Sequence, residues 1–167
     1  MEKKAGRKGQ LEISFGMIFS VLLVVIFIVV AFYVIRHFLE LKDCTLVSQF
    51  YDDLQDNLDK VWKSQESNEA FSALLPSGIT YVCFADMSKP ERGGPEGVYQ
   101  ALRRNLAARH NVFLYPRRKA CDLSSQEIEH LDLQNITKTE NPYCVASDGK
   151  VKFRIEKGFY DALVRIK

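Results

Sequence analysis

The four cysteines are the residues of this 167-residue chain with the greatest capacity for chemistry. They are Cys44, Cys83, Cys121 and Cys144. No two of them have the C-x-x-C spacing of zinc sites or of thioredoxin-like redox sites. An even number of cysteines in a small domain outside the cytoplasm indicates disulfides, and four cysteines allow three pairings. Cys121 and Cys144 flank one polar segment, so we predict a disulfide between them. The alternative is that some cysteines are small buried apolar residues.

The other reactive side chains form no catalytic or cofactor motif. The histidines lack the H-E-x-x-H spacing of a metal-binding helix, and the chain has no G-x-S-x-G elbow of a hydrolase. Gly93 and Gly94 are not followed by the Lys-Ser/Thr pair of a phosphate-binding loop. Glu127 and Glu129 alternate in a polar segment, which is typical of a solvated face. We therefore predict no enzymatic activity, no cofactor and no metal site. The histidines are His37, His110 and His130.

A group of basic residues lies in the middle of the C-terminal part of the chain. Such a group can meet nucleic acid, anionic lipid headgroups or an acidic partner. No RNA-binding motif with interleaved aromatic residues is present, so nucleic acid is not a predicted partner. The favoured interpretation is a solvated basic face, partly offset by the acidic residues of the preceding helix. The group consists of Arg103, Arg104, Arg109, Arg117, Arg118 and Lys119.

The longest regular pattern in the chain is an apolar run near its N-terminus, and the residues described above lie in or beyond it. Residues 13–35 read ISFGMIFSVLLVVIFIVVAFYVI and contain neither a charge nor a proline. A helix of roughly 20 apolar residues spans a bilayer, whereas a helix on a soluble core shows a polar face. We therefore predict a transmembrane helix over residues 10–39, with the lipid bilayer as its partner.

The charges on either side of this run predict its orientation. Residues 1–9 carry four bases and one acid, whereas residues 40–69 carry eight acids and three bases. Short basic flanks remain in the cytoplasm. The sequence therefore predicts a single-pass protein of the cell membrane, with a basic cytoplasmic leader over residues 1–9 and the C-terminal part outside.

The start of the chain also matches a family pattern. Residues 7–10 read RKGQ, and Glu12 and the apolar helix follow them. This stretch resembles the class III signal of archaeal type IV pilin-like proteins, in which a prepilin peptidase cuts between Gly and Gln. In that family the retained apolar helices pack against one another in the core of a filament. The resemblance implies cleavage between Gly9 and Gln10, and assembly with identical or related pilin-like subunits.

The resemblance also implies a role for one carboxylate. In the family a Glu near the mature N-terminus neutralises the amino terminus of a neighbouring subunit, which makes Glu12 an assembly residue. The family usually places Ser third and Glu fifth in the mature chain, the reverse of Glu12 and Ser14. The alternative interpretation of the same stretch is an ordinary signal anchor that is not cleaved.

Two further patterns describe the helix. Gly16 and Ser20 have the small-xxx-small spacing that lets transmembrane helices approach closely, so we predict that they take part in assembly. The alternative is that the spacing arises by chance. Beyond the membrane, apolar residues recur at spacings of three and four up to Trp62. This period predicts an amphipathic stalk helix within residues 40–69, ending near Ser64, whose apolar stripe packs on the chain's own C-terminal part or on a neighbouring subunit.

The remaining residues, 70–167, are predicted to form a small α+β head outside the cytoplasm. Strands are expected at residues 79–84 and 111–116, and a helix at residues 98–108. Residues 124–127 suggest a helical turn and residues 130–136 a strand. Asp148 and Gly149 suggest a two-residue turn joining residues 144–146 and 151–155 as a hairpin.

The fold class predicted from these patterns is therefore α+β, with a long N-terminal transmembrane and stalk helix followed by a small antiparallel-sheet head. The predicted function is that of a pilin-like structural subunit of a surface filament or assembly. A signal-anchored binding module that does not polymerise is the alternative, and an anchored enzyme is the third class.

Overall fold

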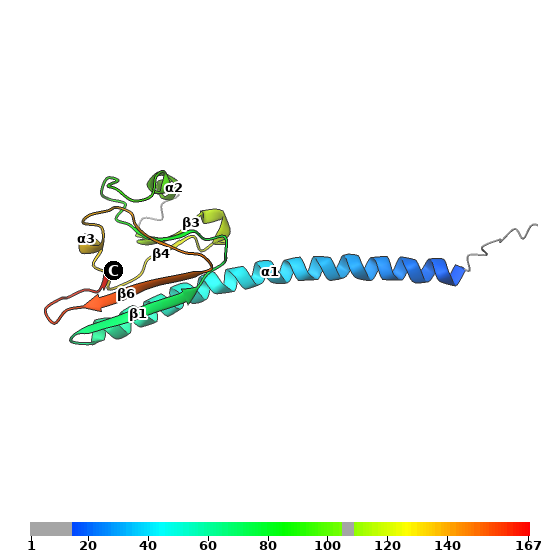
Figure 1. Cartoon of the computed structure of the whole chain (residues 1–167), viewed down its shortest axis with the longest axis horizontal. Coiled ribbons are helices and arrows are strands. Elements are labelled where there is room, and N and C mark those ends of the chain that lie inside the picture. The colour runs from blue at the N-terminus through cyan, green and yellow to red at the C-terminus, as the bar shows by residue number, and fades with distance from the viewer. Residues whose placement is uncertain (1–14, 105–108) are drawn as a thin grey trace, which may run out of the picture. The chain divides into compact units, whose positions relative to one another are not determined.

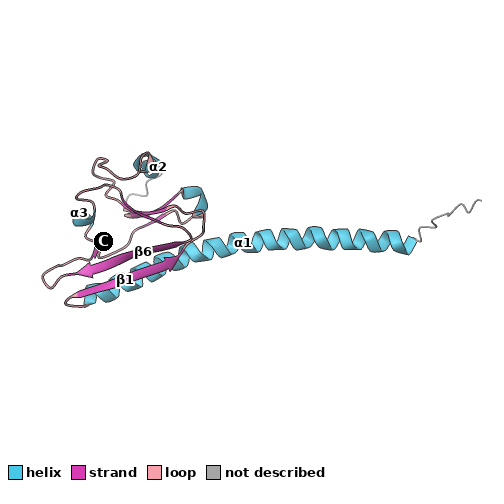
Figure 2. Cartoon of the chain, in the orientation of Figure 1, coloured by secondary structure: helices cyan, strands magenta, loops and turns pink. Residues whose placement is uncertain are grey.

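The structure is a computed structural model that describes residues 15–104 and 109–167. The chain divides into two compact units, the N-terminal unit Met1–Glu40 and the C-terminal unit Leu41–Lys167. Helix α1 (Phe15–Lys63) contributes to both units, and antiparallel sheets follow it (Figures 1 and 2). The predicted α+β class is confirmed. The compact C-terminal unit begins at Leu41, so residues 41–69 belong with residues 70–167 instead of forming a separate stalk.

Helix α1 runs without a break because no glycine or proline lies between Met17 and Lys63. Its second half buries a stripe of side chains in the core of the C-terminal unit, which confirms the chain's own C-terminal part as the partner of this stripe. Lys157 Nζ donates to the carbonyls of Trp62 and Ser64 and so satisfies acceptors at the helix end. The buried stripe consists of Val47, Phe50, Tyr51, Leu54, Leu58 and Val61, each at most 1% exposed.

One antiparallel sheet packs against this stripe. It contains β1 (Ser67–Leu74), β6 (Lys150–Lys157) and β7 (Arg165–Ile166), in the order β1-β6-β7. Phe71 lies opposite Phe153, with ring centroids 4.9 Å apart, and the rings of Phe71 and Phe50 on α1 meet edge to face. The sequence did not predict β1, and the first three residues of this strand fall in the segment 40–69 expected to be stalk.

A second antiparallel sheet completes the core. Its strands are β4 (Ser125–Gln126), β3 (Val112–Tyr115), β2 (Tyr81–Phe84) and β5 (Tyr143–Ala146), in that spatial order. The strands predicted at residues 79–84 and 111–116 are confirmed as β2 and β3. One face of the sheet joins the core around α1, and Cys83 and Phe113 on the other face pack with α2 (Val98–Arg103).

Three local predictions are wrong. Residues 144–146 and 151–155 do not form a hairpin, because β5 pairs with β2 while β6 pairs with β1 and β7. Gly149 has a positive φ of +67°, but Asp148 and Gly149 form a bend that carries the chain from one sheet to the other. Residues 124–127 contain strand β4 instead of a helical turn, because this segment pairs with the edge of β3.

The third error concerns residues 130–136, which form the short helix α3 (Leu133–Ile136) instead of a strand. The Asp132 side chain accepts a hydrogen bond from the backbone N–H of Asn135, as an N-cap residue does. This cap stabilises a helical turn where weak apolar alternation suggests a strand.

Candidate functional site

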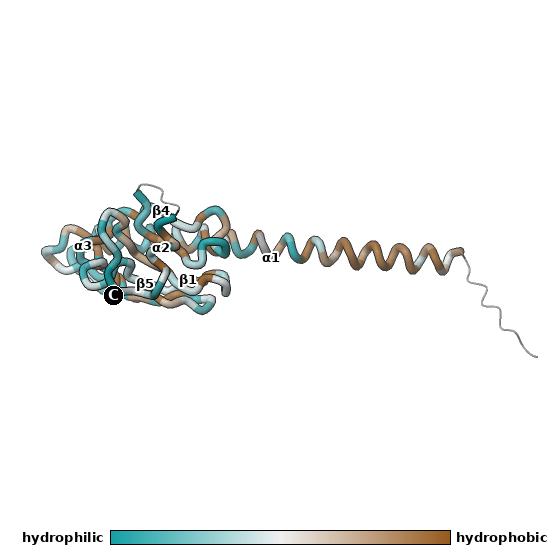
Figure 3. Tube along the Cα trace, turned by 90° about the horizontal axis from the view of Figure 1, so that it is seen from above, coloured by the Kyte–Doolittle hydropathy of each residue, from teal (hydrophilic) through white to brown (hydrophobic). Residues whose placement is uncertain are grey.

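The first candidate site is the apolar segment of α1, residues 15–39. Every residue in this segment is exposed, and the large apolar side chains include Phe27, 68% exposed, and Phe32, 67% exposed. Hydrophobic colour predominates in the part of α1 toward its N-terminal end (Figure 3). Among the described residues, α1 is the one helix long and apolar enough to cross a membrane. Exposure on all sides of the helix distinguishes the segment from a soluble core helix, which would bury at least one face.

The structure describes two of the five residues predicted for processing and assembly. Gly16 and Ser20 lie one turn apart on the same face of α1, and both are exposed. The face they share is therefore open to the close approach of another helix. Gly9, Gln10 and Glu12 lie outside the described residues.

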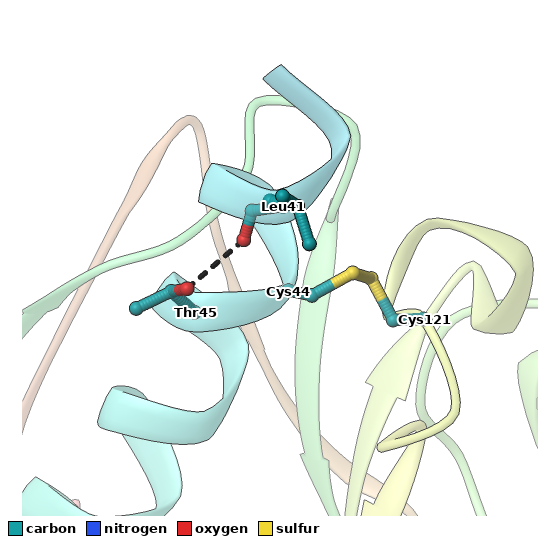
Figure 4. Close-up of a disulfide and its surroundings, with 4 residues drawn as sticks. All are labelled: Leu41, Cys44, Thr45 and Cys121. Atoms are coloured by element: carbon teal, nitrogen blue, oxygen red, sulfur yellow. Dashed lines mark hydrogen bonds between the residues drawn. A yellow bond between two sulfur atoms is a disulfide. The ribbon is translucent and has the colours of Figure 1, made fainter. Parts of the chain in front are cut away.

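The second candidate site is the pair of disulfides in the C-terminal unit. Cys83 on β2 lies directly opposite Cys144 on β5, and the two residues are bonded with their Cα atoms 4.0 Å apart. Cys44 on α1 is bonded to Cys121, with 5.7 Å between the Cα atoms (Figure 4). The predicted Cys121–Cys144 disulfide is therefore wrong. The Cys83–Cys144 pairing follows the strand register of β2 and β5. The polar composition of the segment between Cys121 and Cys144 does not predict that register.

The Cys44–Cys121 disulfide fastens a basic turn to α1. The 3-10 helix η1 (Arg117–Lys119) ends two residues before Cys121, and all three of its side chains are exposed. The other members of the predicted basic group are Arg103, at the end of α2, and Arg104 and Arg109, outside the regular elements. Within the described part of the chain, no member of the group makes an ion pair, with the acidic face of α1 or elsewhere.

A polar cavity of about 390 Å³ opens beside the loop that follows β2. Asn141, only 2% exposed, fixes this loop, because its Oδ1 accepts from the N–H of Asp86 and its Nδ2 donates to the Asp86 carbonyl. Burial opposes ionisation of Asp86, but hydrogen bonds from Ser88 and Lys89 outweigh this effect and lower the pKa of that carboxyl. The cavity offers positive charges and side-chain amides, a combination suited to a polar or anionic group. Its lining includes Lys89, Arg92, Gln134, Asn135, Lys138 and Asn141.

Two histidines of the C-terminal unit have specific contacts. Nδ1 of His110 lies 2.8 Å from Oγ of Ser125, but no described carboxylate lies within ion-pair distance of His110, and the cavity at Ser125 measures only about 10 Å³. His130 stacks on Trp62 with ring centroids 3.8 Å apart, and its Nε2 lies 3.7 Å from Asp59 Oδ1. These contacts of His130 join α1 to the segment before α3.

Residues 15–104 and 109–167 contain no cluster of three histidine, cysteine, aspartate or glutamate side chains arranged to hold a metal ion.

Sequence reasoning missed one exposed apolar feature, the loop between β6 and β7. Tyr160 is 96% exposed and Phe159 58% exposed, and the two rings meet edge to face with centroids 5.1 Å apart. The backbone N–H of Gly158 and then the Arg165 side chain donate hydrogen bonds to Asp161, and these bonds lower the pKa of its carboxyl. The signal available in the sequence was the adjacent aromatic pair, Phe159-Tyr160, between charged residues.

Comparison with known proteins gives no relative from which a function can be transferred. No protein-family model, no curated protein and no solved structure matches this chain.

Proposed function

We propose that this chain is a single-pass, membrane-anchored, pilin-like structural subunit of a surface filament or assembly. The observation that carries the proposal is the division of one 49-residue helix into two chemically different parts. Residues 15–39 expose apolar side chains on all sides, whereas the second part supplies the central stripe of a folded α+β core. A helix of this kind joins an anchor to a folded unit without an intervening linker.

The size of the exposed apolar surface supports a covering of lipid or of other helices. Twenty large apolar side chains in residues 15–39 are exposed. Burial of one such side chain contributes about 1.5–3 kcal/mol, so covering the segment is worth tens of kcal/mol. This free energy far exceeds the stability of a typical domain, and a dispersed chain in water would forfeit it.

The charges and the disulfides support an orientation with the C-terminal unit outside the cytoplasm. The leader, residues 1–9, is basic, and such flanks remain on the cytoplasmic side. The C-terminal unit holds two disulfides, and bonds of this kind persist in oxidising compartments. Two independent features of the chain thus favour the same topology.

The assembly step rests on the resemblance of the N-terminus to a class III signal. Cleavage by a prepilin peptidase after Gly9 would remove all four bases of the leader and leave Gln10 with a free amino group. Glu12 would then lie near the membrane boundary, where a lone carboxylate is costly unless it meets a cation. The new amino terminus of a neighbouring subunit supplies that cation, while Gly16 and Ser20 allow the two helices to approach closely.

Substitutions in the native host test this proposal. Gly9→Leu should leave a longer precursor, and Glu12→Ala should yield a processed protein that fails to enter the sheared surface fraction or to form filaments visible by electron microscopy. Ser14→Ala is the matched control, because it alters a neighbouring mature position without removing a charge. Normal assembly of Glu12→Ala, or a Gly9→Leu protein of the same length as wild type, would contradict the proposal.

A binding module that does not polymerise is the second candidate, and the loop between β6 and β7 favours it. An isolated aromatic pair as exposed as Phe159 and Tyr160 is typical of a surface that meets a partner. The two candidates differ in a simple observation. A binding module would keep residues 1–9 and would remain monomeric in detergent, whereas a pilin-like subunit would lose them and associate through α1.

A further inference from the structure

The basic turn η1 carries three exposed, positively charged side chains. Arg117, Arg118 and Lys119 are exposed, and residues 117–123 carry three bases and one acid. The turn is compact, because the N–H of Ala120 donates to the carbonyl of Arg117 at 3.0 Å. The three positive charges are therefore concentrated within a short distance of Cys121.

The disulfide places this turn beside the first residues of the unit. Cys44 is the fourth residue of the C-terminal unit, and its Cα lies 5.7 Å from that of Cys121. Figure 4 shows the bond leaving α1 within one turn of Leu41 and reaching the loop that carries Cys121. Consecutive Cα atoms are 3.8 Å apart, so Lys119 lies within about 8 Å of Cys121. The basic turn is thus held at the end of the unit where the chain continues into the apolar segment.

The length of chain between the apolar run and this disulfide is short. Ile35 is the last residue of the uncharged run, and Cys44 follows nine residues later within the same helix. Nine helical residues span about 13 Å, and the headgroup layer of one leaflet occupies roughly 6 Å of that distance. The disulfide therefore ties η1 to a point on α1 that lies about 7 Å of helix beyond the headgroup layer. That length is shorter than the Debye length of about 8 Å at physiological salt.

We propose that Arg117, Arg118 and Lys119 bind the headgroups of lipids with a net negative charge, through their phosphate groups, in the bilayer that α1 spans. Guanidinium groups pair with two phosphate oxygens at once, which suits the two arginines to this role. The aliphatic stem of Lys119 covers Gly78, where an added Cβ would lie 2.8 Å from Lys119 Cδ, so this lysine also has a packing role. The inference rests on the membrane anchoring in the proposed function and adds a lipid-binding contact that restrains the C-terminal unit at the membrane surface.

Hydrogen exchange of the full chain in lipid nanodiscs tests the inference. Discs of neutral phosphatidylcholine are compared with discs in which about a third of the lipid is anionic phosphatidylglycerol. One basic residue near an anionic surface raises the equilibrium constant of the contact about fivefold. Because the bound turn opens less often, the amides of residues 116–123 should exchange at least about threefold more slowly in anionic discs than in neutral ones. The difference should disappear in 0.5 M sodium chloride, because salt screens the attraction.

Two charge-matched variants separate this contact from a general effect of net charge. Arg117→Gln/Arg118→Gln should reduce the lipid-dependent slowing well below that of wild type, whereas Lys60→Gln/Lys63→Gln, at two exposed positions in the last turn of α1, should leave it unchanged. Lys63 is 19 residues beyond Cys44 on α1, about 28 Å along the helix axis. Both variants are compared at equal disc occupancy and with wild-type tryptophan fluorescence as the measure of folding.

Three outcomes would overturn the inference. Equal exchange of residues 116–123 in neutral and anionic discs would show that η1 does not recognise anionic lipid headgroups, although the protein is anchored. Equal slowing in neutral discs with 10 mM inorganic phosphate would identify a site for free phosphate instead of lipid. Failure of the chain to enter discs at all would overturn the membrane anchoring as well, so the two failures are distinguishable.

Discussion

Removal of the Cys44–Cys121 disulfide tests how strongly the second half of α1 is tied to the sheets. The double substitution Cys44→Ala/Cys121→Ala deletes a bond between residues 77 positions apart and leaves no unpaired thiol from that bond. In the chain-entropy treatment, closing a loop of this length stabilises the folded state by about 4 kcal/mol. Cys44 is half-buried and Cys121 is exposed, so little packing is lost in addition.

The other disulfide provides an internal comparison. Cys83–Cys144 closes a loop of similar length, 61 residues, so the chain-entropy contribution is again about 4 kcal/mol. Cys83 is fully buried in the cluster beneath α2, and its truncation also leaves a cavity. We therefore expect Cys83→Ala/Cys144→Ala to be the more destabilising of the two double substitutions.

The assay uses the one tryptophan of the chain, Trp62. Its ring stacks on His130 and its Nε1 donates to the carbonyl of Ala162, so its fluorescence reports the packing of α1 on the C-terminal unit. Urea unfolding of the full chain in detergent micelles leaves the apolar segment in the micelle and unfolds the C-terminal unit. With a urea slope of about 2 kcal/mol/M, the loss of Cys44–Cys121 should lower the midpoint by about 2 M.

The control and the refuting result are both specific. Thr45→Ala removes only a side-chain bond to the carbonyl of Leu41, next to the disulfide, and should shift the midpoint by less than about 0.3 M. A Cys44→Ala/Cys121→Ala protein that unfolds at the wild-type midpoint would refute the reasoning. Non-reducing peptide mapping that joined Cys121 to Cys144 would contradict the disulfide arrangement itself.

Three further predictions concern the core and the acid stability. Tyr51→Phe should raise the free energy of unfolding by about 1 kcal/mol, because the buried Oη of Tyr51 has no described hydrogen-bond partner and burial raises its pKa; a loss of stability in urea would count against this. Leu54→Ala should lower the free energy of unfolding by about 2–5 kcal/mol, because Leu54 is buried in the core. Val25→Ala in the apolar segment should leave the fluorescence transition unchanged. Equal shifts of the two urea midpoints would contradict the division of α1 into two parts. A backbone hydrogen bond and a neighbouring arginine lower the pKa of Asp161 in the folded state, so its contribution is present above about pH 5 and is lost as the pH falls below about 4. Asp161→Asn should flatten that loss in urea midpoints measured from pH 6 to pH 2.5, and an unchanged profile would exclude this carboxylate as a cause.

The sequence was sufficient for the elements that depend on long, regular patterns. The apolar run and the three-and-four spacing from Val47 to Val61 predicted α1 to within one residue of its end at Lys63, because both patterns persist over many turns. Strands β2 and β3 were also predictable, since their apolar and β-branched residues fit a sheet buried on both faces.

The elements that the sequence did not predict depend on contacts distant in the chain. Strand β1, with the sequence SNEAFSAL, contains no β-branched residue, and it becomes a strand through its pairing with β6 about 80 residues later. Strand β5 pairs with β2 in the other sheet, so the bend at Gly149 does not join β5 and β6 as a hairpin. The prediction of the disulfide pairing was wrong for the same reason, because Cys83 meets Cys144 only through the β2–β5 register.

The intact mass of the native protein, purified from its own host without reduction, tests the central proposal most directly. A pilin-like subunit with the described disulfides should have the mass of residues 10–167 less four hydrogens, two for each disulfide. Reduction should add those four hydrogens and leave the N-terminus at Gln10. A main species that retains residues 1–9 would contradict the pilin-like account and leave a signal-anchored domain.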